Sequence, residues 1–283
     1  MSNVSRNMAS TTGTQAQGEE LLATVVHLAQ QKWRNRLVAS YALGSLAHGG
    51  FSAVSDIDVA LVLDDPLLGT DGNGVAELTS SIKASNKPFS DRLSVFWGST
   101  TSLSGATSGG RFPPLDRLDL KKYGRLLVGR DVRGSLPLPA QRELVVTGAE
   151  FALPRLATDE VIGKLKSPEA LMRTDQKTLT RLILLPVRFM FTARTGDVGR
   201  NDAAVEHFAA ANGSSASSDL ALLALKWRDA GPDPSDKGAI AAIAAGILPL
   251  YHEFLSDHEP RLREFARPDL AESFCEWRQR LQA

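Results

Sequence analysis

Two aspartates, Asp56 and Asp58, stand one residue apart at the start of an otherwise apolar run, DIDVALVL. Alternate side chains of a β-strand point to the same face, so these carboxylates lie together, roughly 6 to 7 Å apart by the strand rise. Like charges at that separation repel each other unless a cation lies between them. Mg²⁺ is the usual cation there, because it prefers oxygen ligands. The pair therefore predicts a divalent-cation site at the beginning of a strand.

A second polar step, Gly44-Ser45, follows the preceding apolar run RLVASYAL. Glycine lets the backbone approach a ligand closely. Free N–H groups at a helix start, together with a serine hydroxyl, favour a phosphate group. Each motif alone is common, but a strand, Gly-Ser, a short link and Ser-Asp-x-Asp in this order are much more specific. A phosphate contact beside a metal site is the combination that suits transfer of a nucleotidyl group.

The elements around these motifs change character along the chain. Short apolar runs predict strands at 36–43, 56–63, 92–98 and 125–129, and helical spacing predicts helices at 19–33, 75–85 and 115–123. Residues 98–114 are rich in Gly, Ser and Thr, and a loop of that length is usually mobile, functional or both. After about residue 150 the pattern is helical throughout. We predict a disordered tail over 1–18, an α/β domain over 19–150 and an all-helical domain over 151–283.

The composition excludes several classes of protein. The 283 residues carry 32 basic and 32 acidic side chains, so no basic excess indicates wholesale binding to nucleic acid. One cysteine, Cys275, excludes an internal disulfide and a multi-cysteine zinc site. No uninterrupted apolar stretch reaches about 18 residues, so no membrane span is expected. The N-terminal residues lack the apolar core of a secretory signal, and we expect a cytoplasmic protein.

The segment GSLAHGGFSAVSDIDVALVL resembles the signature of the nucleotidyltransferase superfamily related to DNA polymerase beta. It is most similar to aminoglycoside adenylyltransferases of the streptomycin/spectinomycin type. PVRFMFTARTGDVGRNDAAVEHF resembles the motif of their helical domain, and YGRLLVGRDVRGSLPLP resembles the stretch between their domains. The resemblance implies an α+β fold, with a small mixed sheet and helices followed by an all-helical C-terminal bundle. It also implies that ATP and the substrate bind between the two domains.

Within the first motif, the resemblance assigns Gly44 and Ser45 to the nucleotide triphosphate and Asp56 and Asp58 to Mg²⁺. These two aspartates are also its implied catalytic residues.

In the second motif, the resemblance gives Arg188 a contact with the nucleotide phosphates. The family has a lysine where this chain has Asn201, and the adjacent Arg200 is the candidate to supply that positive charge.

The pattern breaks on the next strand, where the family carries a third carboxylate. The matching position is Ser94, whose hydroxyl is neither a useful base near neutral pH nor a strong magnesium ligand. Asp91 lies on the opposite face of a regular strand, and a bulge there would rescue it. Asp116 and Asp119 are further candidates. Either another element supplies the carboxylate or the general base is absent.

Three hypotheses follow. The first is a nucleotidyltransferase that uses ATP and Mg²⁺ to move AMP to a hydroxyl of a small, aminoglycoside-like molecule. The second is a transferase acting on tRNA or protein, for which the Gly/Ser-rich segment leaves room; the balanced net charge does not favour nucleic acid. The third is a nucleotide-binding protein whose catalysis is weakened because Ser94 replaces the third carboxylate. The acceptor, the preferred nucleotide and the oligomeric state stay open.

Overall fold

The computed structural model describes residues 2–282, with side chains from residue 14 onward. The chain forms two compact units, Met1–Pro139 and Ala140–Ala283, which are described separately.

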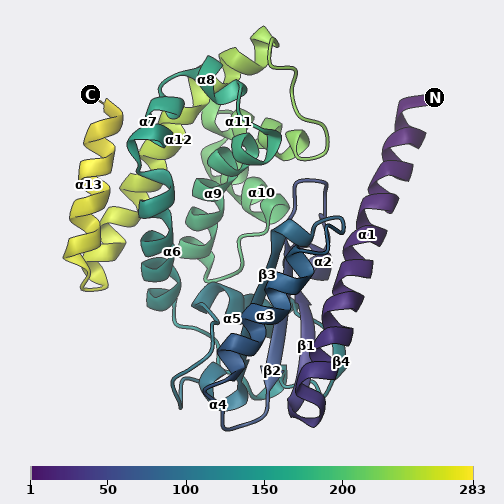
Figure 1. Cartoon of the computed structure of the whole chain (residues 1–283). Coiled ribbons are helices and arrows are strands. Elements are labelled where there is room, and N and C mark those ends of the chain that lie inside the picture. The colour runs from purple at the N-terminus through teal and green to yellow at the C-terminus, as the bar shows by residue number, and fades with distance from the viewer. Residues whose placement is uncertain (1, 283) are drawn as a thin grey trace. The chain divides into compact units, whose positions relative to one another are not determined.

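A four-stranded mixed sheet organises the first unit (Figure 1). Its strand order is β3-β2-β1-β4, where β1 spans Leu37–Leu43, β2 spans Ile57–Leu63, β3 spans Leu93–Ser99 and β4 spans Arg125–Gly129. β1 pairs antiparallel with β2 and β4, whereas β2 and β3 are parallel. The four predicted strands are therefore present, and the sheet is mixed, as the resemblance implied.

The two faces of this sheet have separate cores because side chains alternate along each strand. Val59 and Leu61 of β2 face a cluster that includes residues of α1 (Ser2–Trp33) and α3 (Asp71–Lys83). Ala60, Val62 and Phe96 face the opposite cluster, to which α5 (Pro114–Tyr123) contributes Leu120. Asp58 and Ala60 are two residues apart on β2, so their side chains point to the same face of the sheet. Asp58 therefore lies on the face that α5 covers.

Helix α1 corrects the predicted disordered tail, because its helical backbone begins at Ser2 rather than at residue 19. Residues 1–18 contain no proline, and helix propagation adds one hydrogen bond for each residue fixed, so the packed part can extend toward the N-terminus. Packing reaches Gly18, where an added Cβ would lie 3.1 Å from the Phe51 ring. Glu19 accepts two hydrogen bonds from Arg125 Nη2 of β4, at 2.7 and 2.9 Å.

The segment between β3 and α5 is folded, although the sequence predicts a loop over 98–114. Its first residues form α4 (Thr100–Leu103), and its end returns to β3 through a bridge between Trp97 and Arg111. Trp97 and Arg111 exchange backbone hydrogen bonds of 3.0 and 2.8 Å. Gly110 permits this approach: its φ is +82°, and a Cβ there would lie 2.4 Å from the Trp97 carbonyl oxygen. The bridge therefore fixes where α5 begins.

The second unit is helical throughout, as predicted. Its helices are α6 (Gln141–Leu156), α7 (Asp159–Leu165), α8 (Pro168–Met172), α9 (Gln176–Thr195), α10 (Asn201–Asn212), α11 (Ala216–Trp227), α12 (Lys237–Glu264) and α13 (Pro268–Gln282). All of α6 belongs to this unit, and Val145 and Ala149 are buried in its core. The boundary therefore precedes α6 instead of falling at residue 150.

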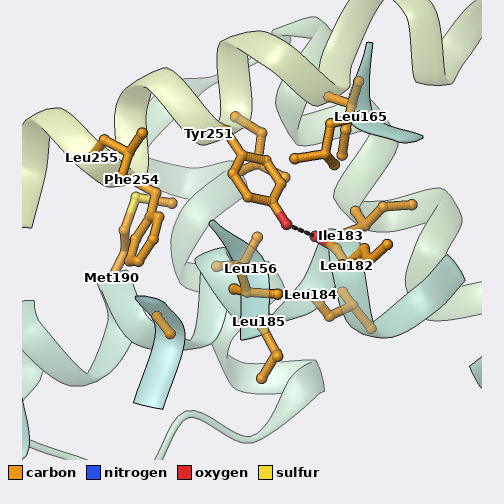
Figure 2. Close-up of a cluster of buried hydrophobic side chains, with 14 of the residues drawn as sticks. Leu156, Leu165, Leu182, Ile183, Leu184, Leu185, Met190, Tyr251, Phe254 and Leu255 are labelled. Carbon is orange, nitrogen blue, oxygen red and sulfur yellow. Dashed lines mark hydrogen bonds between the residues drawn. The ribbon is translucent and has the colours of Figure 1, made fainter. Parts of the chain in front are cut away.

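A buried tyrosine explains how α9 accommodates a proline in its interior. Pro186 has no N–H to donate to the carbonyl of Leu182, four residues earlier. The Tyr251 hydroxyl of α12 donates to that carbonyl oxygen at 2.8 Å (Figure 2). Tyr251 is fully buried, and this burial raises the pKa of its hydroxyl. The hydrogen bond thus joins α9 to α12 within the apolar core.

By length and composition, α12 could cross a membrane. In the structure it packs against α9, α11 and α13, and Ile243, Ile247, Leu250 and Phe254 are buried in the core of the second unit. These contacts are those of a central core helix.

Candidate functional site

The predicted aspartate pair lies at the beginning of β2. Asp56 immediately precedes the strand and is exposed, whereas Asp58 is the second residue of the strand and is partly buried. Asp58 lies opposite Leu43 on β1 and beside Ser94 on β3. Asp58 lies on the face that α5 covers, and Asp56 stands two residues before it, just outside the strand. The structure thus places the carboxylates at the end of the strand that the sequence predicts.

The neighbouring strand carries no carboxylate beside Asp58. β2 and β3 stay in register without a shift from Ile57–Leu93 to Leu63–Ser99, which places Ser94 beside Asp58. Asp91 lies before the strand in a short 3₁₀ turn, Ser90–Arg92, and its side chain is 78% exposed. Its Oδ2 lies 3.8 Å from Nε of Arg92. Because no bulge occurs between these strands, the proposed rescue by Asp91 is wrong.

Position 44 favours glycine because a Cβ there would collide with the carboxylate of Asp58. Gly44 begins the short helix α2 (Gly44–His48) with a φ of +61°, in the left-handed region that glycine adopts readily. A Cβ at this position would lie 2.8 Å from Oδ2 of Asp58. Real Cβ atoms essentially never come that close to another heavy atom. The glycine therefore lets the turn between β1 and α2 pack directly against the Asp58 carboxylate.

A buried aspartate on α5 holds the same turn from the other side. Asp119 is 7% exposed, and its Oδ2 accepts the Gly44 N–H at 2.7 Å. Its Oδ1 lies 3.9 Å from Nε2 of His48, at the other end of α2. The His48 ring packs edge-on against Tyr123, also of α5. Since Asp119 already accepts the Gly44 N–H, the predicted contact between Gly44 and a phosphate stays a prediction.

Asp116 brings a further carboxylate to this region. It lies one helical turn before Asp119 on α5 and is partly exposed. Burial and the negative charges of Asp58 and Asp119 raise the pKa of the Asp116 carboxyl to about 7, against a smaller opposing effect of Arg111. The sequence includes both α5 aspartates among its candidates. It could not choose between them, because their proximity to Asp58 depends on how α5 packs.

These carboxylates fit a magnesium ion that arrives with a ligand. Among the residues that the structure describes, no group of three or more His, Cys, Asp or Glu side chains is arranged to hold a metal. Mg²⁺ is commonly bound by one or two carboxylates plus the phosphates of a substrate, rather than by a complete protein cage. Asp56 and Asp58 supply two hard oxygen donors, and the negative charges of Asp58 and Asp119 add to burial in raising the pKa of Asp116, so negative charge accumulates here. A cation would relieve that excess.

The two predicted cationic residues, Arg188 and Arg200, lie close together in the second unit. Arg188, on α9, donates a hydrogen bond from Nε to the carbonyl oxygen of Gly199. Gly199 packs tightly there, since an added Cβ would lie 2.6 Å from the Arg188 carbonyl oxygen. Arg200 follows at the N-terminus of α10, with its Nε 3.6 Å from Oδ1 of Asp202. The structure thus brings the two arginines together, and their contact with a nucleotide stays a prediction.

The role of Asp119 predicts a difference between two substitutions. We expect Asp119→Ala to destabilise the protein by about 1–3 kcal/mol, because it leaves the Gly44 N–H without this acceptor. Asp119→Asn should cost less than half as much, because the amide oxygen still accepts the hydrogen bond. Urea denaturation of both variants measures the difference. Equal losses would show that the hydrogen bond to Gly44 does not fix the turn.

Together, the four-stranded mixed sheet and the following helical unit form an aminoglycoside adenylyltransferase-like nucleotidyltransferase fold. The chain is similar in structure to spectinomycin adenyltransferase AAD(9) from Enterococcus faecialis, solved with ATP and spectinomycin. The similarity has a TM-score of 0.53 at 13% sequence identity and covers 85% of this chain and 99% of that one. No protein-family model and no curated protein matches the chain. At this identity the likeness establishes the fold.

Proposed function

We propose that the protein is a Mg²⁺-dependent nucleotidyltransferase that moves AMP from ATP to a hydroxyl of a small, aminoglycoside-like molecule. One observation carries the proposal: within this fold, Asp56 immediately precedes β2, Asp58 is its second residue, and Gly44 packs against the Asp58 carboxylate. The structural neighbour, solved with ATP and spectinomycin, supports the choice of nucleotide and acceptor class. We also propose a cytoplasmic location with no membrane partner.

The proposed reaction forms one bond and breaks another at the α-phosphorus of ATP. The acceptor oxygen bonds to that phosphorus, the bond between the α-phosphorus and the oxygen of the β-phosphate breaks, pyrophosphate leaves with that bonding electron pair, and the proton of the acceptor hydroxyl passes to water. When bound, Mg²⁺ neutralises negative charge on the phosphate oxygens. In this proposal Asp56 and Asp58 hold the ion and Ser45 contacts a phosphate. Arg188 and Arg200 are proposed cationic contacts with phosphate oxygens.

A nucleotide-binding protein with weakened catalysis is the second candidate, and Ser94 favours it. The β2–β3 register places this hydroxyl beside Asp58, where a carboxylate would serve transfer better. A macromolecular acceptor gains less support. The Gly/Ser-rich segment that would leave room for tRNA or protein is held to β3 by the Trp97–Arg111 bridge.

An assay with ATP labelled at the α-phosphate separates these candidates. We expect Mg²⁺-dependent transfer of label to at least one member of an aminoglycoside and aminocyclitol panel that includes spectinomycin. Bulk tRNA serves as the macromolecular acceptor. Label found only on tRNA would favour the macromolecular alternative. ATP binding without transfer to any acceptor would favour the second candidate.

A further inference from the structure

Transfer to a hydroxyl needs a group that accepts the hydrogen bond of that hydroxyl and orients its oxygen toward phosphorus. The face of the sheet that carries Asp58 offers few groups for this task. Ser94, beside Asp58, presents a neutral hydroxyl. In the proposed function, Asp56 and Asp58 are occupied by the cation. The remaining carboxylates near this end of β2 come from α5.

Helix α5 is held firmly enough to position such a carboxylate. Pro114 occupies its first turn, where proline is favoured, and the Trp97–Arg111 bridge fixes the preceding chain. Leu120 is fully buried against the sheet. Asp119 is bonded to Gly44, which itself packs against Asp58. The helix is therefore anchored at its start, along its apolar face and beside the aspartate pair.

The two α5 aspartates differ in what they already contact. Asp119 is buried and committed to the Gly44 N–H. Asp116 lies three residues earlier, on the same side of the helix, because residues at i and i+3 are neighbours. Its side chain is partly exposed to solvent. Its charge nevertheless interacts with those of Asp58 and Asp119. Of the two α5 aspartates, Asp116 is therefore the more exposed one, and Asp119 is the one that already accepts the Gly44 N–H.

We propose that Asp116 binds the acceptor hydroxyl as a catalytic residue and fills from α5 the place that Ser94 leaves on β3. The Asp116 carboxylate accepts the hydrogen bond of the acceptor hydroxyl and holds its oxygen for reaction. A carboxylate binds a hydroxyl more strongly than a neutral acceptor does, because the hydrogen bond is charge-assisted. This assignment rests on the proposed function and identifies its acceptor-binding group.

The test compares wild type with Asp116→Asn, with Asp91→Asn as a matched control at an exposed aspartate away from this face. The probe is spectinomycin, or whichever panel member wild type modifies. We expect Asp116→Asn to lower kcat about 10²-fold, the lower end of the range for loss of such a group. Calorimetry with a non-hydrolysable ATP analogue should show probe affinity about tenfold weaker. ATP affinity should match that of wild type and Asp91→Asn, and the thermal midpoint should equal that of wild type or exceed it, because the amide removes a charge that burial and two neighbouring carboxylates disfavour.

A double variant, Asp116→Asn with Ser94→Glu, tests whether the two positions share one role. Turnover of the double variant should be at least tenfold higher than that of Asp116→Asn, because the glutamate places a carboxylate on β3 beside Asp58. Full turnover in Asp116→Asn would overturn the assignment. So would a loss of ATP affinity in step with turnover, or a double variant no better than Asp116→Asn. Absence of ATP binding and transfer in wild type would instead overturn the proposed function.

Discussion

Asp58→Asn is expected to lower the rate of AMP transfer by about 10³-fold or more. A bound cation supplies several kcal/mol of charge stabilisation to such a reaction, and each 1.36 kcal/mol corresponds to a factor of ten. Asparagine keeps the size of the side chain but removes the charge that would hold the cation. Release of labelled pyrophosphate, followed over time at saturating ATP and Mg²⁺, measures the loss.

The fold should survive this change, which separates it from general damage. Asp58 and Asp119 both raise the pKa of Asp116, so removing one of these charges relieves repulsion in the native state. We expect a thermal midpoint equal to that of wild type or higher. Asp91→Asn, at a carboxylate outside the strand, should keep both activity and midpoint. Transfer at the wild-type rate by Asp58→Asn would show that Asp58 takes no part in the reaction.

Gly44→Ala is expected to lower transfer by about 10²-fold, because a misplacement of about 1 Å at a reacting centre has effects of that size. The added Cβ would lie 2.8 Å from Oδ2 of Asp58, so the carboxylate or the turn must move. The positive φ of 61° adds a strain of about 1–2 kcal/mol. Turnover and urea denaturation of the variant measure the two effects separately.

Gly196→Ala is the matched control for backbone strain. Gly196 ends α9 with a φ of +68°, and nothing lies within 4 Å of the Cβ that alanine would add. Both alanine variants should therefore lose similar stability, and Gly44→Ala alone should lose transfer. If the two variants lost activity equally, the close approach of Gly44 to Asp58 would not explain the effect.

The sheet and its aspartate pair could be predicted because they depend on local patterns. Apolar runs bounded by turns predict β1, β2 and β3, and the two-residue period of a strand places Asp56 and Asp58 together. The strands and the spacing of the two aspartates follow from the order of residues along short segments. The family resemblance matches Ser94 to the third-carboxylate position, and the unshifted register of β2 and β3 places it beside Asp58.

The parts that depend on tertiary packing could not be predicted. Asp116 and Asp119 reach the face of β2 through the docking of α5, which follows a segment without a clear period. The hydrogen bond from Gly44 to Asp119 joins residues far apart in sequence. The polar composition of residues 1–18 predicts disorder, whereas the helix nucleated by the buried part of α1 extends through them. The boundary between the units also precedes the predicted one at residue 150, because the burial of α6 in the second core is not visible in its sequence.

Calorimetric titration with ATP, with and without Mg²⁺, tests the central claim most directly when wild type is compared with the double variant Asp56→Asn/Asp58→Asn. We predict that wild type binds ATP in a Mg²⁺-dependent manner and that the double variant loses this dependence while remaining folded. A non-hydrolysable ATP analogue, which should bind in the same way, controls for heat from turnover. Absence of ATP binding to wild type, or equal Mg²⁺-dependent binding to both proteins, would contradict the assignment of this aspartate pair to a nucleotide–metal site.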